Sequence, residues 1–276
     1  MTDRLATRFA ACAAANRAAL VTFVTAGDPD ATTSIAVLRA LVAGGADVVE
    51  LGMPFTDPMA DGPAIQAGNI RALAAGSTLA GVIGMVRDYR REDAATPIIL
   101  MGYMNPLFAY GIARFASDAT DAGIDGLIIV DVPPEEAEEI RPALTANGLH
   151  LVRLAAPTTD SARLPAVLEG ASGFLYYVSM AGVTGTQSID TVAVSAAVAR
   201  LKSATALPVA VGFGIKTAAD AAAVARVADG VVVGSAIVSL IGEAAATRAN
   251  DLPVRVETFV RSLADAIATA RRKEPA

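Results

Sequence analysis

The sequence predicts an α/β protein that folds as a single (β/α)8 TIM barrel with extra helices, and three observations support this. Eight short apolar runs rich in β-branched residues alternate with longer, Ala-rich segments, the pattern of parallel strands connected by helices. Eight such units within 276 residues match the usual size of this barrel. The rival architecture, an open nucleotide-binding sheet, would carry G-x-G-x-x-G after its first strand, where this chain has Ala26-Gly27-Asp28-Pro29.

The expected strands are uninterrupted apolar runs, as in strands that are buried on both faces. In chain order they are Leu20–Thr25, Asp47–Leu51, Pro97–Met101, Gly126–Val130, Leu151–Ala155, Gly173–Ser179, Pro208–Val211 and Gly230–Val233. The expected helices are Thr32–Ala43, Ala64–Ala74, Leu79–Arg90, Ile112–Ala122, Pro134–Ala146, Ser161–Leu168, Val192–Ser203, Thr217–Val227 and Leu252–Arg272. An N-terminal helix and a helix starting near Ser235 are also expected. Because no Ser/Gly linker or charge block divides the chain, residues 1–276 are expected to form one domain.

The composition excludes several classes of protein. The net charge of −6 and the pI of about 4.9 argue against a general nucleic-acid-binding protein, which needs a basic surface. A single cysteine, Cys12, excludes an internal disulfide and a cysteine-built zinc site, and fits a reducing compartment. No uncharged apolar stretch reaches the roughly 20 residues of a membrane span, and we see no signal peptide. We therefore expect a soluble, cytoplasmic protein.

Glycine-rich turns follow the last three expected strands, at Ser179–Gly185, Gly212–Gly214 and Gly234-Ser235. In this barrel the functional loops follow the C-terminal ends of the strands, and the loops after the seventh and eighth strands commonly bind phosphate. Glycine lets backbone N–H groups approach the anion, and a helix N-terminus near Ser235 adds a favourable dipole. Each turn by itself is typical of an ordinary tight turn, but the three together predict a phosphate site.

Two carboxylates are candidates for acid–base chemistry. Glu50 ends the apolar run VVELG, so burial at the mouth of the barrel would raise its pKa and suit it to proton transfer; an ion-paired strand end is the alternative. Asp61 lies in a long loop stiffened by three prolines, and such loops are usually functional or disordered. Asp57 and Asp131 each precede prolines closely and fit turn or helix-start positions equally well.

A carbon–carbon lyase needs an electron sink, and the chain offers few. Of the three lysines, Lys202 closes a helix, Lys273 lies in the tail, and Lys216 starts a helix, so none stands at a strand end as a Schiff-base lysine would. A metal would need histidines or clustered carboxylates, and the one histidine, His150, starts a strand at the opposite end of the barrel. We therefore expect no metal site. We expect carboxylates to carry out the acid–base chemistry, on a substrate that provides its own electron sink.

Six segments, in order over nearly the whole chain, carry a recognisable pattern. They are FVTAGDP from Phe23, ELGMPFTDPMADGP from Glu50, LMGYMNP from Leu100, GVTG from Gly182, GFGI from Gly212 and GSAIV from Gly234. The second is long and very specific, whereas the glycine turns are not. Together they resemble the tryptophan synthase alpha chain family.

The resemblance implies retro-aldol cleavage of indole-3-glycerol phosphate to indole and D-glyceraldehyde 3-phosphate. It also implies a beta chain with pyridoxal phosphate, which receives indole through a tunnel in an α2β2 complex, and no cofactor in this chain. Such a reaction removes the need for an external electron sink. Protonation of indole C3 turns the ring into an iminium-like indolenine, which accepts the electrons of the breaking bond.

The resemblance also implies roles for individual residues. Glu50 matches the family's general acid/base, and Asp61 matches the second catalytic carboxylate, which faces the indole N–H and stabilises its developing positive charge. Positions that line the indole pocket match Phe23, Leu100, Tyr176 and Phe213. Positions of the phosphate cradle match Gly185, Gly214, Gly234 and Ser235. Thr184 matches the threonine that meets the catalytic aspartate when the loop after the sixth strand closes.

Three residues depart from the family pattern or have no role in it. Met180 occupies a position where an arginine is expected, which puts a closed-loop ion pair in doubt. Thr56 stands where serine is common and keeps the hydroxyl. Arg153, inside an expected strand, is interpreted as outward-facing and paired.

Three other functions remain possible from the sequence. A stand-alone indole-3-glycerol-phosphate lyase would need no beta chain. Another phosphate-binding TIM-barrel enzyme, such as a sugar-phosphate isomerase, would share the glycine turns but not the loop from Glu50 to Asp61. A catalytically silent activator of a beta chain would not need both carboxylates.

Overall fold

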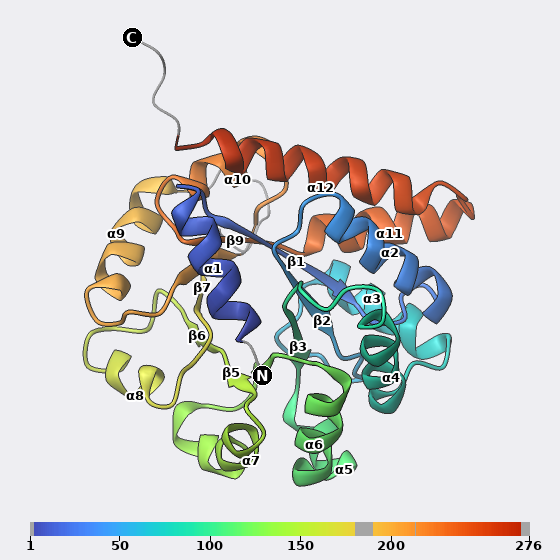
Figure 1. Ribbon diagram of the computed structural model, residues 1–276, viewed down its shortest axis with the longest axis horizontal. Coiled ribbons are helices and arrows are strands. Elements are labelled where there is room, and N and C mark those ends of the chain that lie inside the picture. The colour runs from blue at the N-terminus through green and yellow to red at the C-terminus, as the bar shows by residue number, and fades with distance from the viewer. Residues whose placement is uncertain (1–2, 180–189, 213, 272–276) are drawn as a thin grey trace.

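Nine strands form one parallel sheet that curves around a common interior, with the helices outside it (Figure 1). The computed structural model describes residues 3–179, 190–212 and 214–271. Within them the strands are β1 Ala19–Thr25, β2 Val48–Gly52, β3 Ile98–Gly102, β4 Gly126–Ile129, β5 His150–Leu151, β6 Arg153–Ala155, β7 Leu175–Val178, β8 Val209–Gly212 and β9 Gly230–Val233. Their order is β5-β4-β3-β2-β1-β9-β8-β7-β6. The predicted TIM barrel is confirmed.

The count of nine arises because the predicted strand Leu151–Ala155 is divided into β5 and β6. β5 pairs with β4, whereas β6 pairs with β7. Between them, the Val152 N–H donates to the Leu127 carbonyl at 2.9 Å. One continuous stretch of chain therefore changes its pairing partner midway, and this stretch brings the two ends of the sheet together.

The helices cover the outside of the sheet and one end of its interior. Those described are α1 Arg4–Ala14, α2 Ala31–Ala43, α3 Pro63–Ala74, α4 Leu79–Tyr89, α5 Met104–Tyr110, α6 Ile112–Ala122, the 3-10 helix η1 Pro134–Glu139, α7 Arg141–Ala146, α8 Leu164–Leu168, α9 Thr191–Lys202, α10 Ala218–Ala225, α11 Ser235–Thr247 and α12 Leu252–Thr269. Several begin at a side-chain cap, as where Asp30 accepts from the Thr33 N–H at 2.9 Å. Among the described residues no single helix is long and apolar enough to cross a membrane; α3 and α4 pass that test only together, bent by 92°.

Two helical segments differ from the prediction. The single helix expected over Pro134–Ala146 is broken at Ile140 into η1 and α7. Pro142 explains the break, because proline has no N–H to donate and its ring clashes with the carbonyl four residues earlier. The short helix α5 was not predicted.

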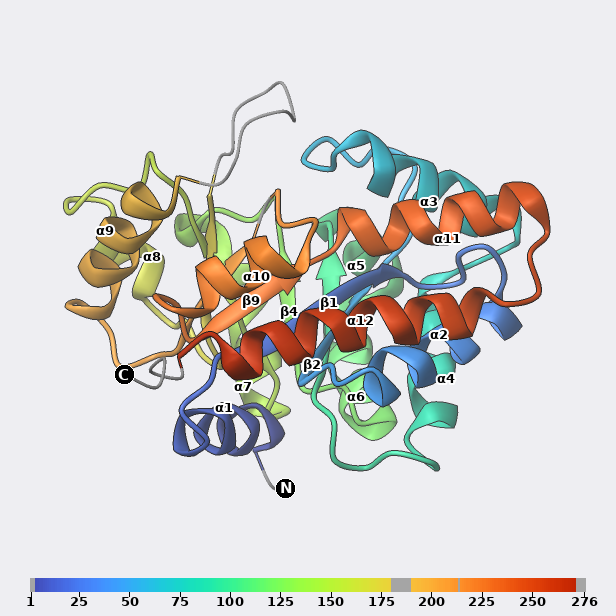
Figure 2. The same ribbon diagram turned by 90° about the horizontal axis from the view of Figure 1, so that it is seen from above.

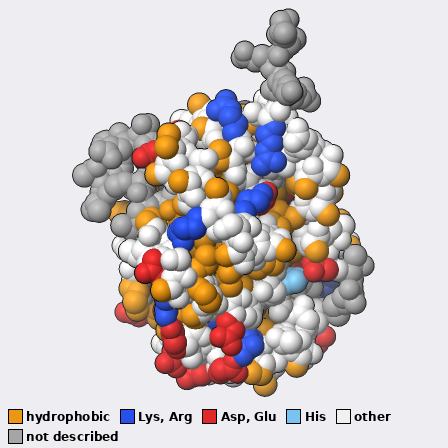
Figure 3. All heavy atoms as spheres, turned by 90° about the vertical axis from the view of Figure 1, so that its left-hand side faces the viewer, with side chains coloured by type: hydrophobic (Ala, Val, Ile, Leu, Met, Phe, Trp, Pro, Cys, Tyr) orange, Lys and Arg blue, Asp and Glu red, His pale blue; other side chains and the backbone are white. Residues whose placement is uncertain are grey.

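The 3-10 helix η1 contains four glutamates. Figure 3 shows acidic side chains gathered along the lower edge of the face that is on the left in Figure 1.

Helix α1 closes the N-terminal end of the barrel, on the side away from residues 52–62 (Figure 2). Its Leu5, Phe9 and Cys12 are buried and pack with the side chains that fill the barrel interior, such as Val48. Cys12 is therefore a core residue. His150 also lies at this end, with its Nε2 3.2 Å from Asp3 Oδ1, which agrees with its expected distance from the chemistry.

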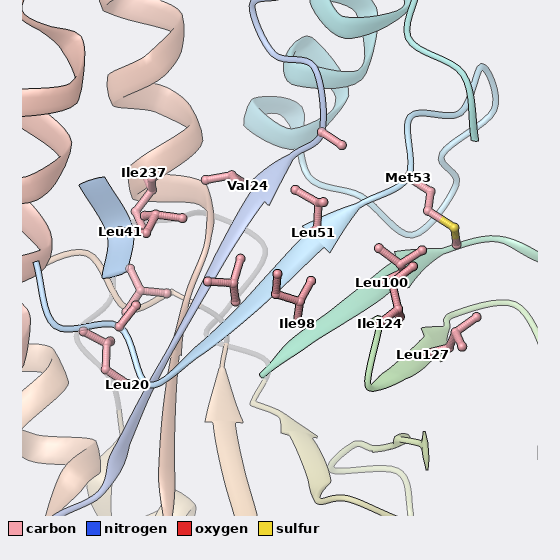
Figure 4. Close-up of a cluster of buried hydrophobic side chains, with 14 of the residues drawn as sticks. Leu20, Val24, Leu41, Leu51, Met53, Ile98, Leu100, Ile124, Leu127 and Ile237 are labelled. Carbon is pink, nitrogen blue, oxygen red and sulfur yellow. The ribbon is translucent and has the colours of Figure 1, made fainter. Parts of the chain in front are cut away.

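A second, larger core lies between the sheet and the helices (Figure 4). Side chains alternate between the two cores along each strand. On β3, Ile98 and Leu100 belong to the outer core, and Ile99 belongs to the inner one. Leu51 of β2 and Val24 of β1 extend the outer core beside them, as Figure 4 shows.

Candidate active site

Glu50 is the middle residue of β2, which continues to Gly52, so it does not end its strand as expected; it is fully buried. It stands two residues after Val48, so it shares the inner face of the sheet. Neither carboxyl oxygen has a hydrogen-bond partner among the described residues. Burial alone raises the pKa of Glu50 to about 8. The side chain is therefore a neutral carboxylic acid at pH 7, close to the pKa that suits a general acid or base, and it is not the ion-paired strand end of the alternative interpretation.

Tyr176 shares this interior with Glu50. It lies on β7 with only 8% of its surface exposed. Burial and, to a smaller degree, the charge of Glu50 raise the pKa of Tyr176 well above its usual range. Gly212 on the neighbouring strand leaves room for the ring, since a Cβ there would stand 2.3 Å from the phenol oxygen. The structure thus places Tyr176 near Glu50, which suits the predicted pocket.

Asp61 lies near the end of the loop that joins β2 to α3. Its Oδ2 accepts a hydrogen bond of 3.1 Å from Asn69 Nδ2, and its carboxyl also bonds to the Tyr103 hydroxyl. Burial raises the pKa of Asp61, and the hydrogen bonds from Tyr103 and Asn69 oppose this. The carboxyl is thus partly desolvated and held by two donors, so it can stabilise positive charge on a ligand.

The same two side chains also hold the loop before Asp61. Asn69 Oδ1 accepts from the Phe55 N–H at 3.1 Å, and the Tyr103 hydroxyl accepts from the Ala60 N–H at 3.0 Å. The rings of Phe55 and Tyr103 pack with centroids 5.2 Å apart. Neither Asn69 nor Tyr103 had a predicted role. Tyr103 stood within the motif LMGYMNP, but for Asn69 the only signal was an amide on the helix that follows the loop.

A narrow cavity lies between β1, β2, β3 and this loop. It is lined by Phe23, Gly52, Met53, Asp61, Asn69, Met101, Gly102, Tyr103 and Val130. Phe23 is therefore in the predicted pocket, but Leu100 is not. Leu100 points into the outer core (Figure 4). Its neighbour Met101 lines the cavity instead, because successive side chains of a strand face opposite sides.

The predicted phosphate cradle is described in part. Gly214 follows β8 with a φ of +78°, a backbone conformation that favours glycine. Gly234 and Ser235 begin α11, and a Cβ on Gly234 would stand 3.2 Å from that of Phe23. The N-terminus of α11 therefore opens beside the cavity, where its free N–H groups favour an anion. Four residues with predicted roles, Met180, Thr184, Gly185 and Phe213, lie outside the described residues.

Three polar residues that were considered in the sequence lie outside the site and contact other parts of the fold. Asp131 Oδ1 accepts from the Met104 N–H at 2.9 Å, at the start of α5. The exposed Asp57 accepts from the Thr56 hydroxyl. Arg153 faces outward as predicted, but it forms no ion pair with any residue that the structure describes. It is 4% exposed, its Nη1 donates to the Val132 carbonyl at 3.2 Å, and its Nε and Nη2 have no partner among the described residues.

The arrangement combines three chemical functions at the C-terminal end of the barrel. Glu50 supplies a buried proton donor and acceptor, Asp61 supplies a partly desolvated negative charge, and the N-terminus of α11 supplies an anion site. Among the described residues, no group of three or more His, Cys, Asp or Glu side chains is arranged to hold a metal ion. The site can therefore bind a phosphorylated ligand, protonate it at one position and stabilise positive charge at another.

Comparisons with known proteins show which family this chain resembles in sequence and in fold. A sequence model of the tryptophan synthase alpha chain matches residues 9–268. The tryptophan synthase alpha chains of Rhizorhabdus wittichii and Phenylobacterium zucineum are 57% and 56% identical to this chain, over 99% of it and 99% and 98% of their own lengths. The crystal structure of the alpha chain from Legionella pneumophila is 38% identical, covers 99% of this chain and 100% of its own, and superposes with a TM-score of 0.91. The chain belongs to the tryptophan synthase alpha chain family.

Proposed function

We propose that this chain cleaves indole-3-glycerol phosphate to indole and D-glyceraldehyde 3-phosphate, as a carbon–carbon lyase within tryptophan synthesis. The observation that carries the proposal is Glu50, a fully buried carboxyl whose pKa is raised to about 8 and whose two oxygens have no hydrogen-bond partner in the described part of the chain. A group of this kind can deliver a proton at neutral pH and take one back. Family membership supports an enzymatic role in tryptophan synthesis.

In the proposed reaction a proton is first added to indole C3, which makes the ring an indolenine cation. The bond between C3 and the carbinol carbon then breaks, and its electron pair returns to the ring to give indole. The hydroxyl proton leaves at the same time, so that the carbinol carbon becomes the aldehyde of D-glyceraldehyde 3-phosphate. One proton is taken up and one is released, and no water or redox partner is needed.

Each proposed residue has a defined part in this reaction. Glu50 protonates C3 and accepts the hydroxyl proton, which requires that the same group be acid and then base. Asp61 faces the indole N–H and stabilises the positive charge of the indolenine. Gly214, Gly234 and Ser235 bind the phosphate, which anchors the substrate without reacting. The remaining proposed contacts are the pocket residues Phe23, Tyr176 and Phe213, the phosphate residue Gly185, and Thr184, which would meet Asp61 on loop closure.

We further propose that indole passes to a beta chain within an α2β2 complex. Membership of the family implies a beta-chain partner. Pyridoxal phosphate would belong to that partner, and this chain would need no cofactor of its own. We place the complex in the cytoplasm, in keeping with the single buried cysteine.

The test of the catalytic assignment is Glu50→Gln, which keeps the shape of the side chain but cannot transfer the proton. We expect indole release to fall by at least about 10²-fold, the lower range for loss of a general acid–base group. Circular dichroism and thermal unfolding of the same sample control for the fold. A folded Glu50→Gln protein that keeps more than a tenth of the wild-type rate would overturn the assignment.

A further inference from the structure

Asn69 has a buried side-chain amide whose oxygen and nitrogen both form hydrogen bonds. It lies in α3 with 4% of its surface exposed. Its Oδ1 accepts from the Phe55 N–H at 3.1 Å, while its Nδ2 donates to Asp61 Oδ2 at 3.1 Å and to the Ile65 carbonyl at 3.2 Å. Because a backbone N–H can only donate, it fixes the oxygen of the amide toward Phe55. The N–H2 group must then point at Asp61.

The helix that carries Asn69 is tightly fixed to the barrel rim. One residue before it, Gly68 packs so closely against β1 that a Cβ would stand 2.9 Å from Thr25 Oγ1. Two residues after it, Arg71 binds the buried carboxyl of Asp28 through two hydrogen bonds of 2.7 Å. Both contacts are to the C-terminal end of β1 and the turn after it. The amide of Asn69 is therefore held in a set position relative to the barrel.

The charged groups around Asp61 are few. Among the described residues, Tyr103 is the titratable side chain that bonds to it, and the charge of Asp131 acts on Tyr103. Asn69 is neutral and can give Asp61 only a hydrogen-bond donor through Nδ2. A donor favours the ionised form of a carboxyl, whereas burial favours the neutral form.

We propose that Asn69 is a positioning residue that holds Asp61 as an ionised carboxylate, in the orientation its catalytic role needs. The proposal rests on the proposed function, which gives Asp61 its task at the indole N–H. Asn69 does this by joining the two ends of the loop: its oxygen holds the backbone at Phe55 and its nitrogen holds the carboxylate. The loop alone would fix neither the direction nor the charge of Asp61.

The substitution Asn69→Asp separates these two contacts. An aspartate at this position still accepts from the Phe55 N–H, so the backbone contact of the loop is kept. It cannot donate to Asp61, and it brings a second carboxylate close to the first. Like charges at this range disfavour ionisation, so the pKa of Asp61 should rise by about 1 pH unit or more. Gln66→Ala is the matched control, because Gln66 Nε2 donates to the backbone carbonyl of Asp61 at 2.8 Å and not to its carboxyl.

Two readouts test the proposal. In indole release, the acid limb of the kcat profile should move to higher pH in Asn69→Asp by about 1 unit, with kcat lowered more than KM is raised, and should stay in place in Gln66→Ala. In 13C NMR of aspartate-labelled protein, assigned with Asp61→Asn, the carboxyl of Asp61 should titrate at higher pH in Asn69→Asp than in wild type. If Asn69→Asp unfolds, Asn69→Ser supplies a smaller side chain for the same two measurements.

The outcomes distinguish the inference from the proposed function. If wild-type protein releases no indole, the proposed function fails, while the NMR titration still decides the role of Asn69. If Asp61 titrates at the same pH in folded Asn69→Asp and wild type, or if Gln66→Ala shifts it equally, the assignment of Asn69 is overturned. A fall in activity with an unmoved pH profile would likewise reduce Asn69 to a structural contact and contradict the proposal.

Discussion

Replacing Glu50 with glutamine should stabilise the protein, by an amount that grows with pH. Glu50 is fully buried, neither oxygen has a partner among the described residues, and burial raises its pKa from 4.5 to about 8. In the unfolded chain the same carboxyl meets water and titrates near its ordinary value. Glutamine has the same shape and no charge to bury, so it removes the penalty that ionisation imposes on the native state.

The magnitude follows from proton linkage. Between pH 4.5 and about 8 the native state keeps the Glu50 proton while the unfolded state has lost it. The unfolded state then binds fewer protons, so the free energy of unfolding falls as pH rises, by about 1.4 kcal/mol per pH unit. Across the whole interval the loss is about 5 kcal/mol. Glu50→Gln does not suffer it, so its advantage over wild type should be small near pH 4.5 and about 5 kcal/mol above pH 8.

Urea unfolding of wild type and Glu50→Gln at pH 5, 6, 7, 8 and 9 measures this difference directly. All other titrating groups are common to both proteins, so they cancel in the comparison. The free-energy difference should rise between pH 5 and 8 and then level off. A difference that stays constant with pH would show that Glu50 is ionised in the native protein at neutral pH, and would refute the reasoning that makes it a proton donor.

Three further predictions concern stability around the site. Arg153→Met should raise the free energy of unfolding by about 1–3 kcal/mol, because it removes buried guanidinium nitrogens that have no partner among the described residues; an unchanged or lower urea midpoint would contradict this. Asp28→Asn should lower the free energy of unfolding by about 3 kcal/mol, since Arg71 loses a buried carboxylate to which it donates two hydrogen bonds. A loss below about 1 kcal/mol in urea unfolding would contradict this prediction. Gly68→Ala should lower the free energy of unfolding by about 1–3 kcal/mol, because the new methyl group would stand 2.9 Å from Thr25 Oγ1. An unfolding temperature equal to that of wild type would contradict this prediction.

The fold was predictable because the sequence pattern is set by burial. Strands such as β2 and β3 are covered on both faces, so they appear as apolar runs between Ala-rich helices. The division of Leu151–Ala155 into two strands was not predictable, because it depends on which neighbours each half meets. The break after Pro134–Glu139 could have been predicted, since Pro142 is incompatible with a continuous helix.

Local sequence pointed to the two carboxylates of the candidate site, but it was less informative about the residues that line the pocket. Glu50 lies near the end of an apolar run and Asp61 lies in the proline-rich loop that follows, which are positions that local sequence reveals. Leu100 was misplaced because an apolar run buried on both faces gives no alternation from which to tell inner from outer side chains; an error of one residue moves a side chain to the opposite face. Asn69 could not be found, because its contacts to Phe55 and Asp61 join residues fourteen and eight positions away.

The most direct test of the account is the release of indole from indole-3-glycerol phosphate by the purified chain, measured by itself and with a matching beta chain and serine. We predict a slow but measurable rate from the isolated chain, lost in Glu50→Gln, and a sharp rise when the beta chain is present. Full activity that the beta chain leaves unchanged would make the chain a stand-alone lyase and contradict its role as a subunit. No indole under either condition would contradict the proposed reaction itself.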